Sequence, residues 1–290
     1  MKSGFVNIFG KPNAGKSTLL NALLGEKLAI VSSKVQTTRH RIKGFLNKKD
    51  VYQIILSDTP GIIEPKYKLH QKMMGNVKSA LEDADVAVLL VDIQDDWDEC
   101  AKLFTSLRLK VPCIIAINKI DKANPDNVKA AKAFFGTLPY CRNVVTLSAL
   151  NQKIFEKLIQ AIVALLPEGM PFYDEDEMTD LPTKFFVGEL IREKIYLLFG
   201  DEIPYHAAVL VNAFKEKTTL IKIQADIIVQ RETQKMILIG EKGSMIKKIG
   251  TLAREDIEKF LEQKVFLELF VKVRPKWRES DAQLKEYGYN

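Results

Sequence analysis

The chain has 290 residues, of which 47% are hydrophobic and 28% charged, and its formal net charge is +6. This composition is ordinary for a soluble globular protein, the length favours two domains over one, and no apolar run is long enough to span a bilayer. Three cysteines without C-x-x-C spacing and three dispersed histidines argue against a zinc site. The chain passes from Met1 directly into a strand-like run, with no signal or transit peptide, so we expect a cytoplasmic protein.

The positive charge is unevenly distributed. Residues 1–167 carry a net charge of +9, residues 168–180 carry −6 and residues 181–290 carry +3. A basic balance is typical of an ordinary solvated surface or of a protein that binds a polyanion. Net charge does not decide between the two, because a nucleotide site alone requires some positive charge.

The first motif runs from Gly10 to Ser17 and reads G-x-x-x-x-G-K-S, between a strand-like run and a helical segment that stops at Gly25. The N–H groups of such a loop and the positive end of the helix dipole converge on an anion. Lys16 supplies a charge for the β- and γ-phosphates, and the Ser17 hydroxyl supplies a hard oxygen for Mg²⁺. A chance loop is the alternative, and the flanking strand and helix argue against it.

Strand-like and helix-like segments alternate through residues 1–166. The alternation indicates βαβ units in a mostly parallel sheet with helices on both faces. The strand-like runs lie near residues 4–9, 42–47, 51–57, 86–92, 112–118 and 143–147.

Polar segments follow several of these elements, at the sheet edge where ligands bind in open α/β folds. The loop of residues 35–41 contains Thr37 and Thr38, either of which can complete a Mg²⁺ shell. Asp58 begins the sequence D-T-P-G, where a carboxylate can hold Mg²⁺ directly or through water, and Gly61 lets a backbone N–H approach a γ-phosphate. An ordinary surface loop and a common turn are the alternatives.

The sequence N-K-I-D ends the strand-like run near residues 112–118. Its carboxylate, Asp121, can accept hydrogen bonds from guanine N1–H and N2–H₂, which adenine does not offer in that arrangement. The Asn118 amide can brace the loop, and the Lys119 stem can cover the base plane. A backbone N–H of the S-A-L sequence at residues 148–150 can reach guanine O6.

The order of these motifs resembles the translation-factor class of Ras-like GTPases over residues 1–166. The resemblance implies a three-layer α/β/α P-loop domain that binds GTP with Mg²⁺ and hydrolyses it to GDP. It implies that the catalytic residues are Lys16, Thr38 and Gly61. It implies that the metal ligands are Ser17, Asp58 and Thr38, with Thr37 open as the alternative. The residues implied to bind GTP are Gly10, Asn13, Ala14, Gly15, Lys16, Ser17, Thr18, Asp58, Gly61, Asn118, Lys119, Asp121, Ser148, Ala149 and Leu150.

One position departs from the Ras pattern. Ile62 follows D-x-x-G where Ras-type enzymes carry a water-orienting glutamine, and an isoleucine cannot hydrogen-bond a water molecule. We therefore expect slow intrinsic hydrolysis, on the order of 10⁻⁴ to 10⁻² s⁻¹ by analogy with unstimulated GTPases. Several relatives with an asparagine at the position of Asn13 use a bound K⁺ as a charge stabiliser, and we hypothesise K⁺ stimulation here.

A punctuated, acidic stretch separates this region from a second domain. Proline and glycine end the last helix near residue 167, and the acidic residues that follow lack periodicity. We expect a GTPase domain over residues 1–167, an acidic interdomain linker over 168–182, and a second domain with a C-terminal tail over 183–290.

The second domain is patterned as a helix, two strands, a pair of short helices and a last strand. The tight loop from Gly240 to Gly243 lies between the paired helices in the context I-G-x-x-G-x-x-I-K-x-I. This context resembles the KH RNA-binding module, in the smaller α+β arrangement (type II) where extra elements precede the core. In that module the loop lies against the sugar–phosphate backbone, and about four bases fill an apolar groove.

Local charge agrees with an RNA-binding role, since residues 231–254 carry a net charge of +4. A basic stretch at residues 274–278 holds one aromatic ring that can stack on RNA, with a solvated tail as the alternative. The residues expected to bind RNA are Gly240, Glu241, Lys242, Gly243, Lys247, Lys248 and Trp277.

A GTPase domain followed by a KH domain is the arrangement of the Era family of bacterial GTPases, and I-R-E-K-I at Ile191–Ile195 extends the resemblance. The family implies binding near the 3′ end of 16S ribosomal RNA and a role in assembly of the small (30S) ribosomal subunit. We expect a monomer. One alternative is an RNA-modifying enzyme, which would need a further catalytic cluster. Another is a membrane-associated or cell-cycle GTPase, peripheral at the inner membrane face, whose second domain binds protein.

The two domains are expected to communicate. A γ-phosphate with its Mg²⁺ should order the loop of Thr37 and Thr38 and the region of residues 61–72. That ordering should alter the contact between the domains and expose the RNA groove.

Overall fold

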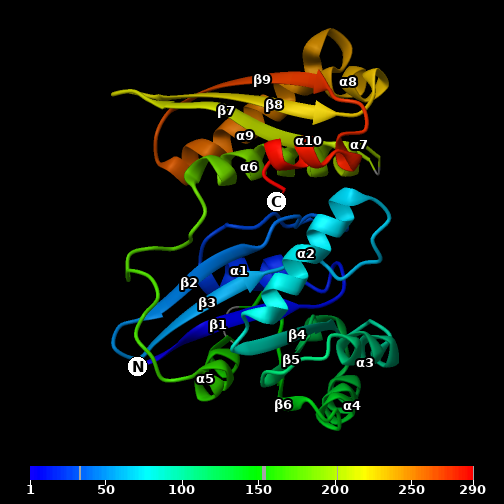
Figure 1. Cartoon of the computed structure of the whole chain (residues 1–290), viewed down its shortest axis with the longest axis vertical. Coiled ribbons are helices and arrows are strands. Elements are labelled where there is room, and N and C mark those ends of the chain that lie inside the picture. Colours follow the sequence, from blue (N-terminus) through cyan, green and yellow to red (C-terminus); the bar gives the residue numbers. More distant parts are fainter. Residues whose placement is uncertain (33, 152–154, 201, 290) are drawn as a thin grey trace. The chain divides into compact units, whose positions relative to one another are not determined.

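The computed structural model describes residues 1–32, 34–151, 155–200 and 202–289. Its contacts divide the chain into two compact units, one of residues 1–64 and 73–180 and the other of residues 65–72 and 181–290. The first unit contains a six-stranded sheet and the second a three-stranded sheet (Figure 1). The expected fold class, an α/β domain followed by a smaller α+β domain, is confirmed.

In the first unit the sheet has the strand order β2-β3-β1-β4-β5-β6. Strand β2 is antiparallel to β3, and all other neighbours are parallel. The carboxyl ends of the parallel strands therefore share one edge, where a ligand site is expected. The elements are β1 (Lys2–Phe9), α1 (Lys16–Leu24), β2 (Ile42–Lys48), β3 (Tyr52–Asp58), α2 (Lys68–Glu82), β4 (Val86–Asp92), α3 (Trp97–Ser106), β5 (Cys113–Asn118), η1 (Ile120–Lys122), α4 (Pro125–Gly136), β6 (Cys141–Thr146) and α5 (Phe155–Leu165).

Uninterrupted apolar runs form the central strands of this sheet. Residues 86–91 of β4 and 113–117 of β5 are buried throughout, as expected for strands covered on both faces. Helices α2, α3 and α4 pack on one face through Val77, Phe104 and Phe135. Helix α1 contacts β2 and β3, and α5 contacts β5 and β6, on the other face.

The acidic segment after α5 lies along the edge of this sheet. The Gln53 side-chain oxygen accepts a hydrogen bond from the backbone N–H of Tyr173 at 3.1 Å, and the Tyr173 ring stacks on Phe45 with centroids 3.9 Å apart. The backbone N–H of Phe45 donates to the Met178 carbonyl at 2.9 Å. This segment therefore acts as a strap over the edge strand β2, whose outward N–H groups would otherwise be open to pairing with another chain.

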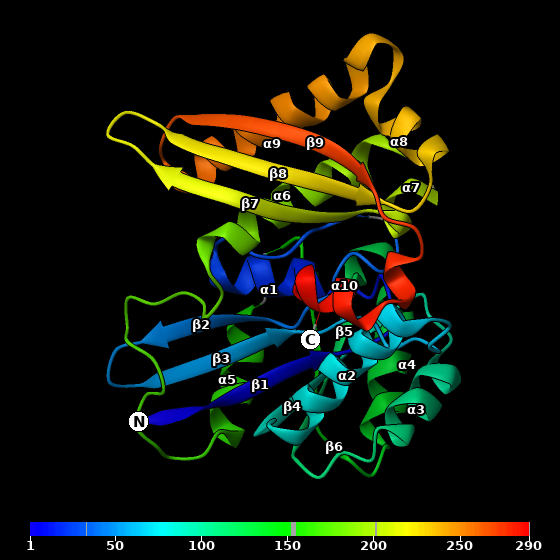
Figure 2. The same cartoon turned by 45° about the horizontal axis from the view of Figure 1, so that its top comes forward.

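In the second unit the sheet order is β7-β8-β9, with β7 antiparallel and β9 parallel to β8. A parallel pair needs a crossover, and here α8, the G-x-x-G loop and α9 provide it. Leu238, Ile249 and Ile257 of these helices share one buried core with Ile191 and Ile195 of α6. Figure 2 shows the three helices beside the three-stranded sheet. The elements are α6 (Thr183–Leu198), α7 (Glu202–His206), β7 (Ala208–Glu216), β8 (Ile221–Val229), α8 (Glu232–Ile239), η3 (Glu241–Gly243), α9 (Ser244–Leu261), β9 (Val265–Val273), η4 (Trp277–Glu279) and α10 (Asp281–Glu286).

Candidate nucleotide site and RNA-binding loop

The loop between β1 and α1 holds a buried lysine. Lys16 is only 5% exposed, and its ammonium donates to the carbonyls of Gly10 and Lys11 at 3.1 and 2.9 Å. Gly15 has φ +99°, and a Cβ at this position would lie 2.4 Å from the Asn118 amide nitrogen. Only glycine fits there, so the loop keeps its N–H groups open toward an anion at the start of α1.

Three oxygen-bearing side chains meet at the start of the same helix. The Ser17 hydroxyl lies 2.8 Å from the Thr38 hydroxyl and donates to Asp58 Oδ2 at 2.6 Å. Thr38 also donates to Asp58 Oδ2, at 3.0 Å. Asp58 is fully buried, and its Oδ1 has no hydrogen-bond partner within the described part of the chain. An oxygen donor set with a buried, half-satisfied carboxylate suits a hard cation such as Mg²⁺. Thr38, one of the two threonines considered, has its hydroxyl within hydrogen-bond distance of Asp58.

Burial shifts the pKa values of the two charged groups of this site in opposite directions. It lowers the pKa of Lys16 from 10.5 to about 8, against the opposing effect of the Asp58 carboxylate. It raises the pKa of Asp58, against the Lys16 charge and the hydrogen bonds from Ser17 and Thr38. Burial therefore outweighs the partners that favour the charged form of each group, and an anion at Lys16 or a cation at Asp58 would favour that form further.

Asn118 joins two loops at the carboxyl edge of the sheet. Its amide donates to the Ala14 carbonyl at 2.8 Å, and its side-chain oxygen accepts from the Ala149 N–H at 2.9 Å. The Lys119 ammonium donates to the Asn13 carbonyl at 2.9 Å and pairs with Asp92 at 2.5 Å. The phosphate loop and the residue 148–150 loop are thus held together by side chains from the end of β5.

These loops enclose a cavity of about 480 Å³, large enough for a nucleotide. Asp121 is exposed and lines this cavity, as Thr37, Thr38 and Gly61 do. Of the residues expected to bind GTP, those that line it are Asn13, Gly15, Lys16, Ser17, Thr18, Gly61, Asn118, Lys119, Asp121, Ser148, Ala149 and Leu150. The other three support the wall, because Gly10 and Ala14 offer carbonyls to Lys16 and Asn118, and Asp58 contacts Ser17.

Sequence reasoning did not identify several residues of this region. The cavity is also lined by Pro12, Ile30, Val31, Ser32, Gln36, Ile63 and Lys122. Their residue types do not indicate a binding site, because only the path of the loops brings these residues to the cavity. Asp92 is different, because it ends an apolar strand as Asp58 does, and that signal could have identified it.

The Ile62 side chain packs away from this cavity. It is half-buried against the core cluster of α3 and α4 and lines a separate cavity with Lys11, Pro12 and Leu103. Its backbone N–H donates to the Gly10 carbonyl at 3.4 Å. The position after D-x-x-G thus fastens the loop to the apolar core, and its isoleucine side chain cannot position a water molecule.

The G-x-x-G loop of the second unit is a tight left-handed turn between α8 and α9. Gly240, Lys242 and Gly243 have φ of 71°, 49° and 80°. A Cβ at Gly240 would lie 2.7 Å from the Met245 side chain, whereas at Gly243 the nearest heavy atom would be 4.0 Å away. The backbone is therefore open to a ligand at Gly243, whereas Met245 covers Gly240. The side chains around the loop that are exposed are Glu241, Lys242, Lys247 and Lys248.

Trp277 does not fit the role expected for it. Its side chain is fully buried, its indole N–H donates to the His206 carbonyl at 3.0 Å, and its ring packs on Tyr287 and Tyr289. A ring with no exposed face cannot stack on a base, so the prediction that Trp277 binds RNA is wrong. It anchors the C-terminal segment to the second unit, and burial of the large indole explains why an aromatic residue stands in this basic stretch.

Within residues 1–32, 34–151, 155–200 and 202–289, no three His, Cys, Asp or Glu side chains gather as a metal-binding group. Among the helices that the structure describes, none has the length and apolar character needed to cross a membrane.

Comparisons with known proteins agree with both units. Residues 5–119 match the family model of the 50S ribosome-binding GTPase, and residues 202–278 match that of the KH domain. The GTPase Era of Geotalea uraniireducens is 44% identical, and the match covers 99% of this chain and 98% of that protein. The GTPase Era of Clostridium kluyveri is 42% identical, and the match covers 100% of this chain and 99% of that protein.

Two solved structures are similar over the full chain. One is an Aquifex aeolicus Era variant bound to GDP and AlF4⁻, 40% identical with a TM-score of 0.96. The other is Era in complex with MgGDPNP and nucleotides 1506–1542 of 16S ribosomal RNA, 41% identical with a TM-score of 0.95. Each match covers 100% of this chain and 99% of the chain in the solved structure. The chain therefore belongs to the Era family of GTPases.

Proposed function

We propose that this GTPase is a nucleotide-controlled RNA-binding switch that acts on the 3′ region of 16S ribosomal RNA during assembly of the 30S subunit, as a monomer in the bacterial cytoplasm. The observation that carries the proposal is the pairing of a phosphate and guanine site in one unit with an open G-x-x-G loop in the other. The similar Era bound to MgGDPNP and 16S ribosomal RNA supports the choice of both ligands.

Different residues of the first unit would bind the phosphates, the metal ion and the base of the nucleotide. Lys16 and the N–H groups after Gly10 bind the phosphates, and the Gly61 N–H lies where a γ-phosphate would end. Mg²⁺ would be held by Ser17, Thr38 and Asp58, and when bound it would neutralise charge on the β- and γ-phosphates. Asp121 accepts the guanine N–H donors.

Nucleotide binding is expected to weaken with rising pH. Lys16 must be protonated to bind phosphate, and in the free protein its pKa is about 8. Above that pH the free protein carries one proton fewer than the complex, so binding takes up a proton and the Kd for GDP should rise by up to about tenfold per pH unit. Below about pH 7 Lys16 should contribute no further pH dependence to the Kd. Isothermal titration calorimetry at pH values below and above the pKa of Lys16 measures the Kd for GDP.

The Lys16→Arg variant is the control for that measurement. Lys16→Arg should bind GDP more weakly than the wild-type protein. Because arginine keeps its proton throughout the range, the Kd of this variant should show only the pH dependence of the nucleotide itself. The same slope in both proteins would contradict the assignment of the effect to Lys16.

We also propose that K⁺ assists hydrolysis, with the side-chain oxygen of Asn13 beside the phosphates as its ligand. Ile62 supplies no polar group to the reacting phosphate, so a bound monovalent cation would provide the missing positive charge. Hydrolysis should be faster in K⁺ than in Na⁺ buffer, and Asn13→Ala should remove the difference. Equal rates in the two buffers would contradict the proposal.

An RNA titration tests the whole function. RNA with the sequence of the 16S 3′ region should bind with an affinity that falls steeply with salt, because phosphate contacts release counterions. The affinity should differ between the complex with GDP and the complex with a non-hydrolysable GTP analogue. An RNA affinity that is identical with both nucleotides would refute the switch, and an absence of RNA binding would refute the RNA role.

A further inference from the structure

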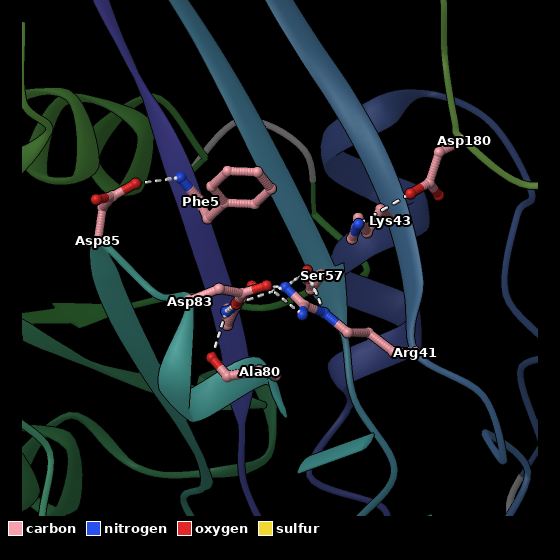
Figure 3. Close-up of polar contacts among 9 residues, drawn as sticks. Phe5, Arg41, Lys43, Ser57, Ala80, Asp83, Asp85 and Asp180 are labelled. Carbon is pink, nitrogen blue, oxygen red and sulfur yellow. Dashed lines mark hydrogen bonds and ion pairs between the residues drawn. The ribbon is translucent and has the colours of Figure 1, made fainter. Parts of the chain in front are cut away.

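A partly buried ionic cluster lies in the first unit, and none of its residues lines the nucleotide cavity. Figure 3 shows its side chains. Arg41 and Asp83 form a bidentate pair, with Nη1 to Oδ2 at 2.5 Å and Nη2 to Oδ1 at 2.9 Å. The same guanidinium donates to the Ser57 hydroxyl at 3.0 and 3.1 Å and to the Asn7 side-chain oxygen at 3.1 Å. We name these four residues the Arg41 cluster.

The Arg41 cluster ties four separate elements together. Arg41 directly precedes β2, Asn7 lies on β1, Ser57 lies on β3, and Asp83 follows the last residue of α2. The Asn7 amide completes the link to this helix end by donating to Asp83 at 2.9 Å and to the Ala80 carbonyl at 2.5 Å. The four elements therefore share one network rather than a set of separate pairs.

The guanidinium end of the cluster is shielded from water, whereas its carboxylate end is partly open. The Arg41 side chain is 10% exposed, Asn7 and Ser57 are fully buried, and the Asp83 side chain is 39% exposed. A planar fork on a carboxylate is directional, and the buried Asn7 and Ser57 side chains fix the guanidinium in one orientation, which an ordinary surface ion pair lacks. The contact can therefore hold backbone in place, and the backbone that it holds is the end of the residue 35–41 loop.

That backbone leads directly to the metal site. Thr38, three residues before Arg41, contacts Ser17 and Asp58, and Ile42 directly after Arg41 is the register partner of Asp58. Between them, the Arg39 carbonyl accepts a hydrogen bond from Asn76 of α2 at 3.2 Å. The short segment from Thr38 to Arg41 is thus held at the metal-site oxygens at one end and on α2 at the other.

We propose that Arg41 and Asp83 are positioning residues, which hold the Thr38 hydroxyl in the geometry that binds Mg²⁺ with GTP. Helix α2 follows the D-x-x-G loop in the chain, so the pair also joins the two segments that a γ-phosphate would order. The inference rests on the proposed role of Thr38 as a metal ligand. Neither Arg41 nor Asp83 lines the cavity, so they act through Thr38 and not on the nucleotide.

The test compares two nucleotides in the full-length protein. In Arg41→Ala, the affinity for a non-hydrolysable GTP analogue should fall about tenfold, and the Mg²⁺ concentration for half-saturation should rise by a similar factor. The affinity for GDP, which lacks the γ-phosphate, should stay within about twofold. Asp83→Asn should also lower the affinity for the GTP analogue. The double variant should bind the analogue no more weakly than Arg41→Ala alone, because the two substitutions remove the same Arg41–Asp83 contact.

Two further variants separate this effect from a general loss of structure. Lys43→Ala is the matched control. Lys43 lies on β2, the strand that Arg41 directly precedes, and its ion pair of 2.9 Å joins it to Asp180 and not to Asp83 at the end of α2 (Figure 3). This substitution should change neither nucleotide affinity. Arg41→Lys keeps the charge but loses the fork, so it should fold and show an intermediate loss.

Thr38→Ala distinguishes failure of this inference from failure of the metal-site proposal. If Thr38→Ala raises the Mg²⁺ requirement and Arg41→Ala does not, the positioning role is overturned while the metal site stands. If Thr38→Ala has no effect on the Mg²⁺ requirement, the metal role of Thr38 is overturned, and the positioning role falls with it. Equal losses for GDP and the GTP analogue in Arg41→Ala would also overturn the inference, since they indicate a purely structural contact.

Discussion

The Asp121→Asn substitution is expected to change the base preference of the protein from guanine to xanthine. Asp121 is exposed at the cavity, on the turn that follows Asn118. A carboxylate offers two acceptors to guanine N1–H and N2–H₂, whereas an amide offers one acceptor and sets its N–H₂ against a second donor. Xanthine has a carbonyl at that position, so the amide donor gains a partner.

The expected magnitude is large because the lost hydrogen bonds are specific to one base. GDP affinity should fall by about 100-fold or more, and xanthosine diphosphate should bind more tightly to the variant than to the wild-type protein. Competition of the two nucleotides against a fluorescent analogue measures both affinities. The Lys16 and Asp58 contacts are unchanged, so binding should still depend on Mg²⁺.

Asp126→Asn is the matched control for this substitution. Asp126 lies in the first turn of α4, and its side chain is 93% exposed and paired only at the surface with Lys129. Removing that charge should leave both nucleotide affinities as they are. If Asp121→Asn retains its preference for guanine, the assignment of Asp121 as the base-reading residue is wrong.

The Gly243→Asp substitution is expected to abolish RNA binding while GTP binding persists. The new Cβ would have its nearest neighbour, Ile246, at 4.0 Å, so the side chain fits without collision. The φ of 80° is strained for most residues, but aspartate tolerates it better, and the cost should be about 1 kcal/mol. The carboxylate would then project where an RNA phosphate should lie.

Charge repulsion at this close contact should lower RNA affinity by about 100-fold or more at low salt. Fluorescence anisotropy with labelled RNA measures the loss, and GDP affinity should remain within about twofold, since the nucleotide site belongs to the other unit. Gly243→Asn has the same shape without the charge, so it should lose less. RNA affinity that is unaffected by the aspartate would contradict the role of the loop.

Much of the fold follows from signals that lie close together in the chain. The apolar runs of β4 and β5 predict strands buried on both faces, and the structure has these strands at Val86–Asp92 and Cys113–Asn118. The phosphate loop and the G-x-x-G loop are similar cases, because each has its glycines, its lysine and its flanking helix within one short stretch. Turn geometry and helix ends are local, so residue type alone carries them.

Side-chain partners that are distant in the chain could not be predicted in this way. The hydrogen bond from Thr38 to Asp58 depends on the path of the residue 35–41 loop, which brings this hydroxyl to the end of β3. Trp277 stands in a basic stretch that suggests RNA, and only its burial against Tyr287 shows that its role is structural. In each case residue type permits several partners, and the packing of remote elements selects one.

The sequence by itself determined the two-domain plan, the class of each domain, and the motifs for phosphate, guanine and RNA. Each of these depends on residues that act within a single turn or on periodic burial. The tertiary structure alone decided the strap on β2, the choice of Ala14 and Ala149 as the partners that Asn118 braces, and the Arg41 cluster. A charged or amide side chain does not specify its partner, because only the register of the sheet and the docking of α2 bring Arg41, Ser57 and Asp83 within hydrogen-bond distance.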